Sequence, residues 1–383
     1  MKRDHRLDTI RGLMLVVMTI DHLDSPLKKL TLETFGYVTA TEGFVFLSGL
    51  VAGLVYTRMG SQDNQRLYQR SRGRAFDIYF SHLALVILLL CTSLFITPVV
   101  LSAHPELWQP LIEYGFFSSL ALYASLLYQS DLLNILPMYF IFLLLTPTLI
   151  DILEKGRIWW WAVFLSSAAL WGSTQFELGI DQLVDNTAGL LIPVEMGYFQ
   201  ISAWQFLFIT GLAIGFYRHH YNAPCLPKRP VLFWLCASIA LSLFIIHHGH
   251  RVITYHRFSA YIPDFLHVWD MHVDAVLDIW VSASRATLAP LRLLNFVVVA
   301  YLIARFFDRF PMWSQWRWLS FLGRHSLQVF MYQIILLFAY SAISPQIHSR
   351  LLEIALTVVA VASLSLPAWG HEKFRKHYPQ STW

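Results

Sequence analysis

Long apolar runs alternate with short polar segments along the whole chain, and this pattern predicts a bundle of membrane-spanning helices. About ten runs are long enough to cross a bilayer. They lie at residues 9–23, 36–57, 78–100, 132–153, 158–173, 198–217, 231–247, 288–306, 319–340 and 350–369. The apolar stretch 110–128 is an interfacial helix, a re-entrant segment or a further span. We therefore expect an all-α polytopic membrane protein, with residues 1–383 forming a single integral-membrane domain.

The composition strengthens this prediction. Hydrophobic residues make up 56% of the chain and charged residues only 14%, whereas a soluble domain has about a quarter of its residues charged. Cys91, Cys225 and Cys236 have neither disulfide nor metal spacing, so we expect no bound metal. No basic face carries interleaved stacking residues, and we expect no binding of nucleic acid.

The distribution of basic residues predicts the orientation. With the N-terminus placed inside, about three quarters of the 28 Lys and Arg residues fall in the inner tails and loops. Both termini are then cytoplasmic. The first apolar run ends in DHLDSP, which lacks the small residues of a signal cleavage site, so we expect it to remain in the membrane.

Arg11 and His22 are the most informative polar residues of the first apolar run, LDTIRGLMLVVMTIDHLD. On a helix, their separation corresponds to about three turns and a rise of about 16 Å, so both side chains share one face. Polar groups at membrane depth are costly and tend to face a cavity or a pathway. Arg11 can bind an anion and His22 can act as a general base. The structural alternatives are a snorkelling arginine and an interfacial histidine.

Two acidic residues lie near this pair. Asp21 is adjacent to His22, although a helix turns its side chain about 100° away. Glu42 lies at the start of the second run, where an acidic group is a functional candidate by default; pairing with Lys28 or Lys29 is its alternative role. The same run contains Gly49 and Gly53, a GxxxG spacing that favours close helix packing.

The segment RLYQRSRGR, residues 66–74, contains the densest basic cluster, and we predict a cytoplasmic loop. Its arginines are either phosphate ligands for a nucleotide-like donor or a topology signal. The chain has no P-loop and no GxGxxG, so nothing supports ATP or NAD chemistry. The outer segment 247–287 is rich in His, Tyr, Trp and Asp, which indicates either a sugar-binding surface or an interfacial segment.

Five stretches, in order, carry a resemblance to a known family: RLDTIRGLMLVVMTIDH, EGFVFLSGLVAGLVY, DLLNILPMYFIFLLLTP, AWQFLFITGLAIG and LGRHSLQVFMYQIIL. They resemble the acyltransferase-3 superfamily, whose signature is an Arg, ten residues and a His in the first span. The closer resemblance is to its OpgC-like branch of osmoregulated periplasmic glucan succinyltransferases. The chain departs from the wider superfamily at Gln333, where a His is common.

This resemblance implies an acyl-CoA-dependent O-acyltransferase of the bacterial inner membrane. The donor is cytoplasmic acyl-CoA, with succinyl-CoA as the donor of that branch, and the acceptor is a hydroxyl of a periplasmic glucan or another glycan. We expect His22 to act as general base, with Arg11, Asp21 and Glu42 completing the catalytic site. A covalent acyl-histidine is the alternative to direct transfer. A homo-oligomer and contacts with glucan-synthesis proteins are further expectations.

The remaining candidate residues divide between the two substrates. We expect the donor-binding residues to be Asp8, Arg66, Arg70, Arg72 and Arg74. We expect the acceptor or the acyl carboxylate to be bound by Arg285, Arg292 and Trp269.

Three alternatives stay open at this point. One keeps the fold but transfers acetyl, or modifies another surface glycan. Another is a transporter for a polysaccharide or a lipid-linked sugar, with Arg11, Glu42 and His22 along its path. Such a transporter predicts two related halves with broken helices, which the sequence does not contain. A nonenzymatic scaffold is the third alternative.

Overall fold

The computed structural model describes residues 4–92, 105–130, 132–188, 194–222, 227–254 and 285–377. Within these ranges the regular elements are helices, and one isolated bridge joins Tyr128 to Glu195. The helices are α1 (His5–His22), α2 (Lys28–Thr31), α3 (Ala40–Gly60), α4 (Asn64–Thr92), α6 (Pro105–Ala124), α7 (Ile135–Glu154), α8 (Arg157–Thr174), α9 (Ile180–Ala188), α10 (Ile201–His220), α11 (Pro230–Thr254), α14 (Pro290–Arg309), α15 (Arg317–Arg324), α16 (Ser326–Ile343), α17 (Arg350–Ser363) and α18 (Ser365–His377), with 3₁₀ turns η1 (Pro311–Ser314) and η2 (Ser344–Gln346).

Seven segments in the described ranges are long and apolar enough to cross a membrane: α3, α4, α7, α11, α14, α16 and the pair α17–α18. The chain is therefore a multi-pass helical membrane protein. Helix α1 falls outside this group because it carries four charged residues, Arg6, Asp8, Arg11 and Asp21. The count of about ten spans stays a prediction, as does the orientation of the termini.

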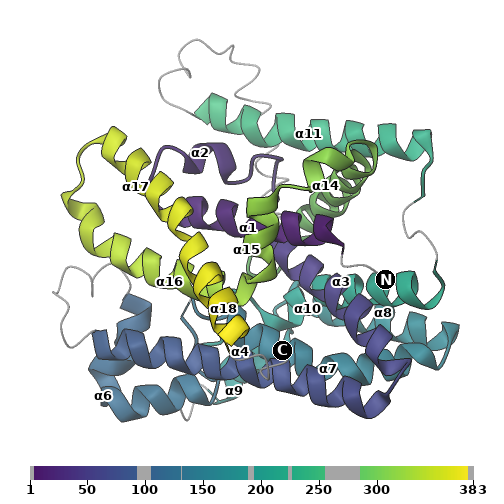
Figure 1. The fold of residues 1–383 in the computed structure, drawn as a ribbon, viewed down its shortest axis with the longest axis horizontal. Coiled ribbons are helices and arrows are strands. Elements are labelled where there is room, and N and C mark those ends of the chain that lie inside the picture. Colours follow the sequence, from purple (N-terminus) through teal and green to yellow (C-terminus); the bar gives the residue numbers. More distant parts are fainter. Residues whose placement is uncertain are drawn as a thin grey trace.

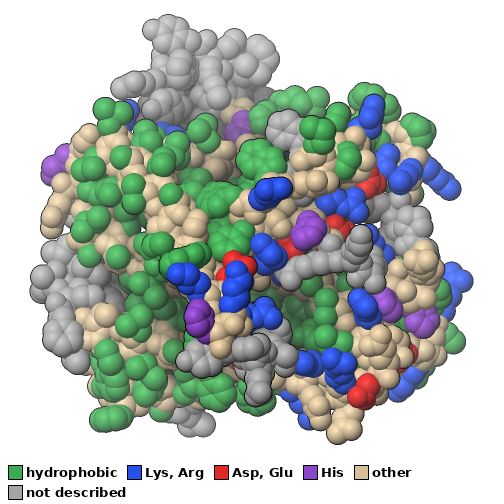
Figure 2. Space-filling model, in the orientation of Figure 1, with side chains coloured by type: hydrophobic (Ala, Val, Ile, Leu, Met, Phe, Trp, Pro, Cys, Tyr) green, Lys and Arg blue, Asp and Glu red, His purple; other side chains and the backbone are tan. Residues whose placement is uncertain are grey.

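The long helices lie side by side, with α15 crossing α1 steeply near its middle (Figure 1). Apolar side chains cover much of the surface, whereas Lys and Arg gather in the centre and on the right of the view (Figure 2). On the face shown, the basic side chains are thus unevenly distributed.

The basic segment 66–74 is not a loop, and that prediction was wrong. These residues form the first turns of α4, which runs without interruption from Asn64 to Thr92. Arginine is a good helix former, and buried Leu67, Ser71 and Ala75 recur every four residues. The sequence analysis gave weight to the charge of these arginines and predicted a loop, so the helical spacing of the buried residues was not recognised.

Two other predicted segments are interrupted. The ninth apolar run, 319–340, breaks at His325 into α15 and α16. The stretch 110–128 largely falls in α6, whose backbone turns at Gly115 with φ 76°. A positive φ carries little steric cost at glycine, so this residue permits the kink.

Glycines bring two pairs of helices into backbone contact. A methyl group at Gly49 of α3 would overlap the carbonyl oxygen of Phe208 on α10, and Gly211 of α10 packs in the same way on α3. The predicted packing role of the GxxxG spacing is confirmed. Gly12 of α1 and Gly323 of α15 meet equally closely. These contacts fix the positions of α1 and α3, the helices that carry Arg11, His22 and Glu42.

The glycine contact between α3 and α10 generates a stability prediction. Gly49→Ala places a methyl group against backbone that cannot move aside, and overpacking of this kind costs about 1–3 kcal/mol. We expect a lower thermal midpoint for the detergent-solubilised protein, measured by size-exclusion chromatography after heating. Gly73→Ala is the control, since that α4 position has open space around it and Ala favours a helix. Equal midpoints for the two variants would contradict the close contact.

Candidate functional site

Arg11 projects from α1 into a cavity of about 180 Å³ between α1, α3, α4, α7 and α16. Its guanidinium approaches the carbonyl of Leu47 at 3.5 Å. Arg74 of α4 lines the same cavity, as do the hydroxyl side chains of Ser48 and Tyr139. Two cations thus meet a mostly apolar space, which suits the narrow, uncharged part of an anionic ligand.

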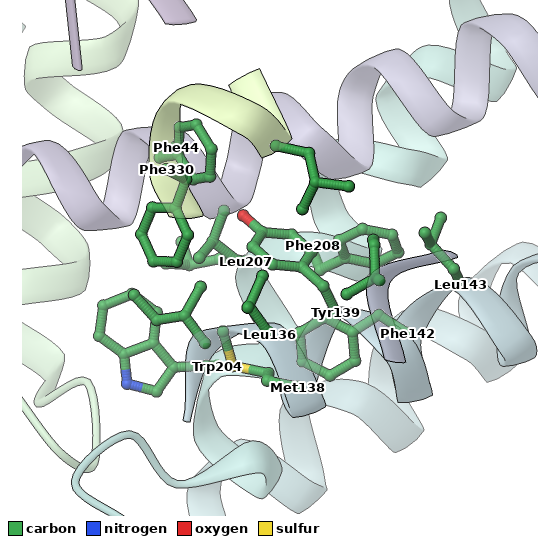
Figure 3. Packing of buried hydrophobic residues seen from close by; sticks show 14 of the residues in the cluster. Phe44, Leu136, Met138, Tyr139, Phe142, Leu143, Trp204, Leu207, Phe208 and Phe330 are labelled. Carbon is green, nitrogen blue, oxygen red and sulfur yellow. The ribbon is translucent and has the colours of Figure 1, made fainter. Parts of the chain in front are cut away.

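Aromatic side chains form much of the cavity wall. Phe44 of α3 stacks on Phe330 of α16 with ring centroids 6.3 Å apart, and Tyr139 meets Phe44 edge to face at 6.0 Å. Figure 3 shows Tyr139 reaching from α7 with its hydroxyl toward this pair, beside Phe208. Leu15 and Met18 are buried in the core and do not line the cavity.

The arginines of α4 divide between two faces of the helix. Arg66, Arg70 and Arg74 follow one another at four-residue spacing, and burial increases from the exposed Arg66 to the half-buried Arg70 and Arg74. Arg72 points elsewhere and lies over the ring of Tyr68 at 5.3 Å. The structure therefore brings one of the four predicted donor-binding arginines, Arg74, to the cavity wall.

His22, at the end of α1, has a fixed tautomer. Its Nδ1 lies 2.6 Å from the carbonyl oxygen of Met18, one turn back. A carbonyl oxygen can only accept, so Nδ1 carries the proton and donates it to this bond. In the neutral ring, Nε2 then has the lone pair, and the side chain is exposed. The ring is thus prepared to take up a proton through Nε2.

Charged groups surround the end of α1. Lys28 and Arg285 lie close enough for their charges to act on His22, and the same two cations act on Asp21. The hydroxyl of Thr31 donates a 2.6 Å hydrogen bond to Asp21. Asp21 therefore holds the segment after α1 in place, and among the described residues it forms no hydrogen bond with the ring of His22.

A buried ion network lies behind this surface. One Nη of Arg292 donates to Glu42 and the other to Glu33, both at 2.8 Å. Arg292 and Glu42 are 2% and 1% exposed. Glu42 also accepts from the backbone N–H of Thr39 in a capping box at the start of α3. Glu42 thus pairs with Arg292, where the sequence had suggested Lys28 or Lys29.

Glu33 contacts three side chains from distant parts of the chain. It accepts from Arg292, accepts from Arg285 at 3.0 Å, and lies 3.5 Å from Nε2 of His247. Burial alone would raise the pKa of this carboxyl, but the charge of Arg285 and the hydrogen bond from Arg292 outweigh it and lower the pKa below its ordinary value. Glu33 is therefore ionised at neutral pH.

The backbone around Glu33 is held in unusual conformations. Glu33 itself has φ 56°, which is rare for a residue with a side chain. Gly36 has φ 97° and packs against the amide of Asn295, whose oxygen accepts the Tyr37 N–H at 2.6 Å. Such conformations persist where surrounding contacts over-determine them, and they concentrate at functional sites.

The predicted site residues therefore fall into two groups. Arg11 and Arg74 line the cavity, whereas His22, Asp21, Glu42, Arg285 and Arg292 lie at or behind the other end of α1. Asp8 is buried where α15 crosses α1. Trp269 and most of the predicted sugar-binding segment 247–287 lie outside the described residues.

The sequence analysis missed Glu33, His247 and Asn295. Glu33 sits in a short polar connection, and the one available signal was an acidic residue between two apolar runs. His247 begins the segment 247–287, which we interpreted as a sugar-binding surface or an interfacial segment and did not connect with a carboxylate. Among the described residues, no group of three His, Cys, Asp or Glu side chains is arranged to hold a metal ion.

One of three comparisons with known proteins gave a match. A model of the family described as OpgC protein matches residues 3–376, nearly the whole chain. Neither the search of curated proteins nor the search of solved structures gave a match. Since the match runs through every helix described above, the chain belongs to the OpgC family of membrane acyltransferases.

Proposed function

We propose that this protein transfers a succinyl group from cytoplasmic succinyl-CoA to hydroxyl groups of periplasmic glucans at the bacterial inner membrane. The observation that carries the proposal is the state of His22. Its Nδ1 proton is committed to the Met18 carbonyl, its Nε2 is left as an acceptor, and the same helix delivers Arg11 to an apolar cavity.

His22 acts as general base in this scheme. Its Nε2 takes the proton of an acceptor hydroxyl while the oxygen attacks the thioester carbonyl carbon. The carbon–sulfur bond breaks as the new ester bond forms, and the thiolate takes the proton back from the imidazolium. Protons balance, and the products are a glucan ester and free CoA. The charge of Lys28 favours the negative charge that develops on the carbonyl oxygen.

Arg11 serves the donor rather than the reacting atoms. It lies about 16 Å along the helix from His22. A cavity of about 180 Å³ is smaller than the roughly 300–1,000 Å³ of sites for drug-sized ligands. It therefore suits the pantetheine arm, and the nucleotide must remain outside. To reach His22, the arm must displace side chains packed along α1.

Arg285 is the better candidate for the distal carboxylate of a succinyl group. Both terminal nitrogens of Arg292 are occupied by Glu33 and Glu42, and Arg292 is buried. The side chain of Arg285 is 35% exposed and uses one nitrogen for Glu33. A guanidinium with a free edge can bind a carboxylate in two-pronged geometry.

Removing the proposed base should abolish most of the transfer. We expect His22→Ala to lower the rate about 10²–10⁴-fold, because that is the usual contribution of a general base. The measurement is the amount of succinylated glucan, by mass spectrometry, in a deletion strain that carries either version at matched membrane levels. His348→Ala, an exposed histidine on another segment, is the control. Equal succinylation by His22→Ala and the native protein would remove His22 from the chemistry.

Neutralising Arg285 should alter donor selectivity. We expect Arg285→Gln to lower the kcat/KM for succinyl-CoA about tenfold or more relative to acetyl-CoA, since a charge-assisted hydrogen bond contributes about 1.5–3 kcal/mol. Arg285→Lys keeps the charge beside Glu33 and should retain part of the preference. Lys29→Gln controls for the loss of a nearby positive charge. An unchanged ratio of the two donors in Arg285→Gln would place the carboxylate elsewhere.

Arg292 should behave as a structural residue. Arg292→Gln leaves the buried Glu42 without a cation and Glu33 with Arg285 alone, and breaking a buried ion pair in this way costs about 3–5 kcal/mol. We expect a large loss of folded protein by size-exclusion chromatography. Adding Glu33→Gln and Glu42→Gln to the same chain should restore much of it, because the buried charges are then gone. Normal folding of Arg292→Gln alone, with loss of succinyl transfer, would instead support direct substrate binding by Arg292.

A further inference from the structure

A second cluster of basic side chains lies near Arg74, at the end of α18. The proposed function assigns no role to this cluster. His371 and Arg375 lie one turn apart on α18. Helix α16 packs against both α18 and α4, the helix of Arg74, and the charges of Arg375 and Arg74 both act on His371. His325 joins α15 to α16 and follows Arg324. Lys, Arg and His side chains gather around the end of α18 in Figure 2.

A histidine pair fixes this end of α18. Nδ1 of His325 and Nδ1 of His371 are 2.8 Å apart, so one ring donates and the other accepts. Burial, followed by the charges of His371 and Arg324, lowers the pKa of His325 to about 4. His325 is thus neutral at pH 7, and its hydrogen bond holds His371 and Arg375 close to Arg74.

The positive charge here is poorly neutralised. Within the described part of the chain, neither Arg324 nor Arg375 forms an ion pair, and Arg324 lies over the ring of Phe321 at 5.7 Å. Arg74 has Asp77 at 3.9 Å. The nearby Glu372 is shared with Lys376, at 3.8 Å. A surface that carries uncompensated cations attracts anions.

We propose that Arg74, His371 and Arg375 form a binding site for phosphate groups at the mouth of the cavity, and that its occupant is the nucleotide end of the acyl-CoA donor. This inference rests on the proposed function. The cavity beside Arg74 is too small for a nucleotide, so the phosphates must lie outside it and near it. The C-terminal helix thereby becomes part of the donor site. The phosphate of an anionic lipid headgroup shares the required chemistry.

Binding of CoA by the purified full chain tests the proposal without acyl transfer. The protein is placed in phosphatidylcholine nanodiscs, and binding of CoA and of pantetheine, which has no phosphate, is measured by calorimetry. We expect Arg375→Gln and His371→Asn to raise the Kd for CoA about tenfold each, with pantetheine binding unchanged. His371→Asn retains a hydrogen-bonding group near Nδ1 for His325. Arg350→Gln, at the far end of α17, is the matched charge control and should bind as the native protein does.

The outcomes are distinguishable. Native protein that binds CoA, with equal affinity in Arg375→Gln and His371→Asn, would overturn the phosphate site and leave the proposed function intact. Native protein that binds no CoA would overturn both. Repeating the binding measurements in phosphatidylglycerol nanodiscs tests whether the site binds the phosphate of a lipid headgroup instead. If the variants lose bound phosphatidylglycerol but keep their affinity for CoA, the site belongs to a lipid headgroup and the donor assignment is wrong.

Discussion

Arg292 holds two carboxylates together where water does not reach, and the geometry at one end of the bundle depends on this contact. Glu42 is at the start of α3, Glu33 is in the segment that follows α2, and Arg292 is in the first turn of α14. The network is close to neutral when Arg285 is included, and its hydrogen bonds compensate the loss of solvation. Without Arg292, no ion pair would connect α14 to the start of α3 and to the segment that follows α2.

This anchor explains how an exposed histidine can sit in a defined environment. His22 is the last residue of α1, and the chain beyond it is held by the hydrogen bond of Thr31 to Asp21 and by the ion pairs of Glu33 with Arg285 and Arg292. The left-handed backbone of Glu33 costs free energy that the ion pairs offset. Much of the order at the reacting end is therefore supplied by Arg292, Glu33 and Glu42, which do not contact the substrate in the proposed scheme.

The sequence predicted local features well and distant pairings poorly. One continuous α1 carrying both Arg11 and His22 is confirmed, because helical spacing alone relates them. The pairing of Glu33 with Arg292 spans 259 residues, and no local pattern encodes it. The arginines of residues 66–74 were assigned to a loop because their charge outweighed the four-residue spacing of Leu67, Ser71 and Ala75. The contact of His325 with His371 depends equally on how two remote helices meet.

Leu15 and Met18, buried between Arg11 and His22, have an electrical consequence. A water-filled path along this face of α1 would conduct protons, and each charge moving down a 100 mV potential releases about 2.3 kcal/mol. In the proposed scheme, this packed layer separates the cavity at Arg11 from the end of α1 at His22. The thin pantetheine arm itself carries no charge, so the succinyl carboxylate at its tip is the one charged group of the arm that has to pass this layer. In the proposed scheme, an acyl group therefore crosses the membrane through this protein while the buried layer prevents a continuous leak of protons.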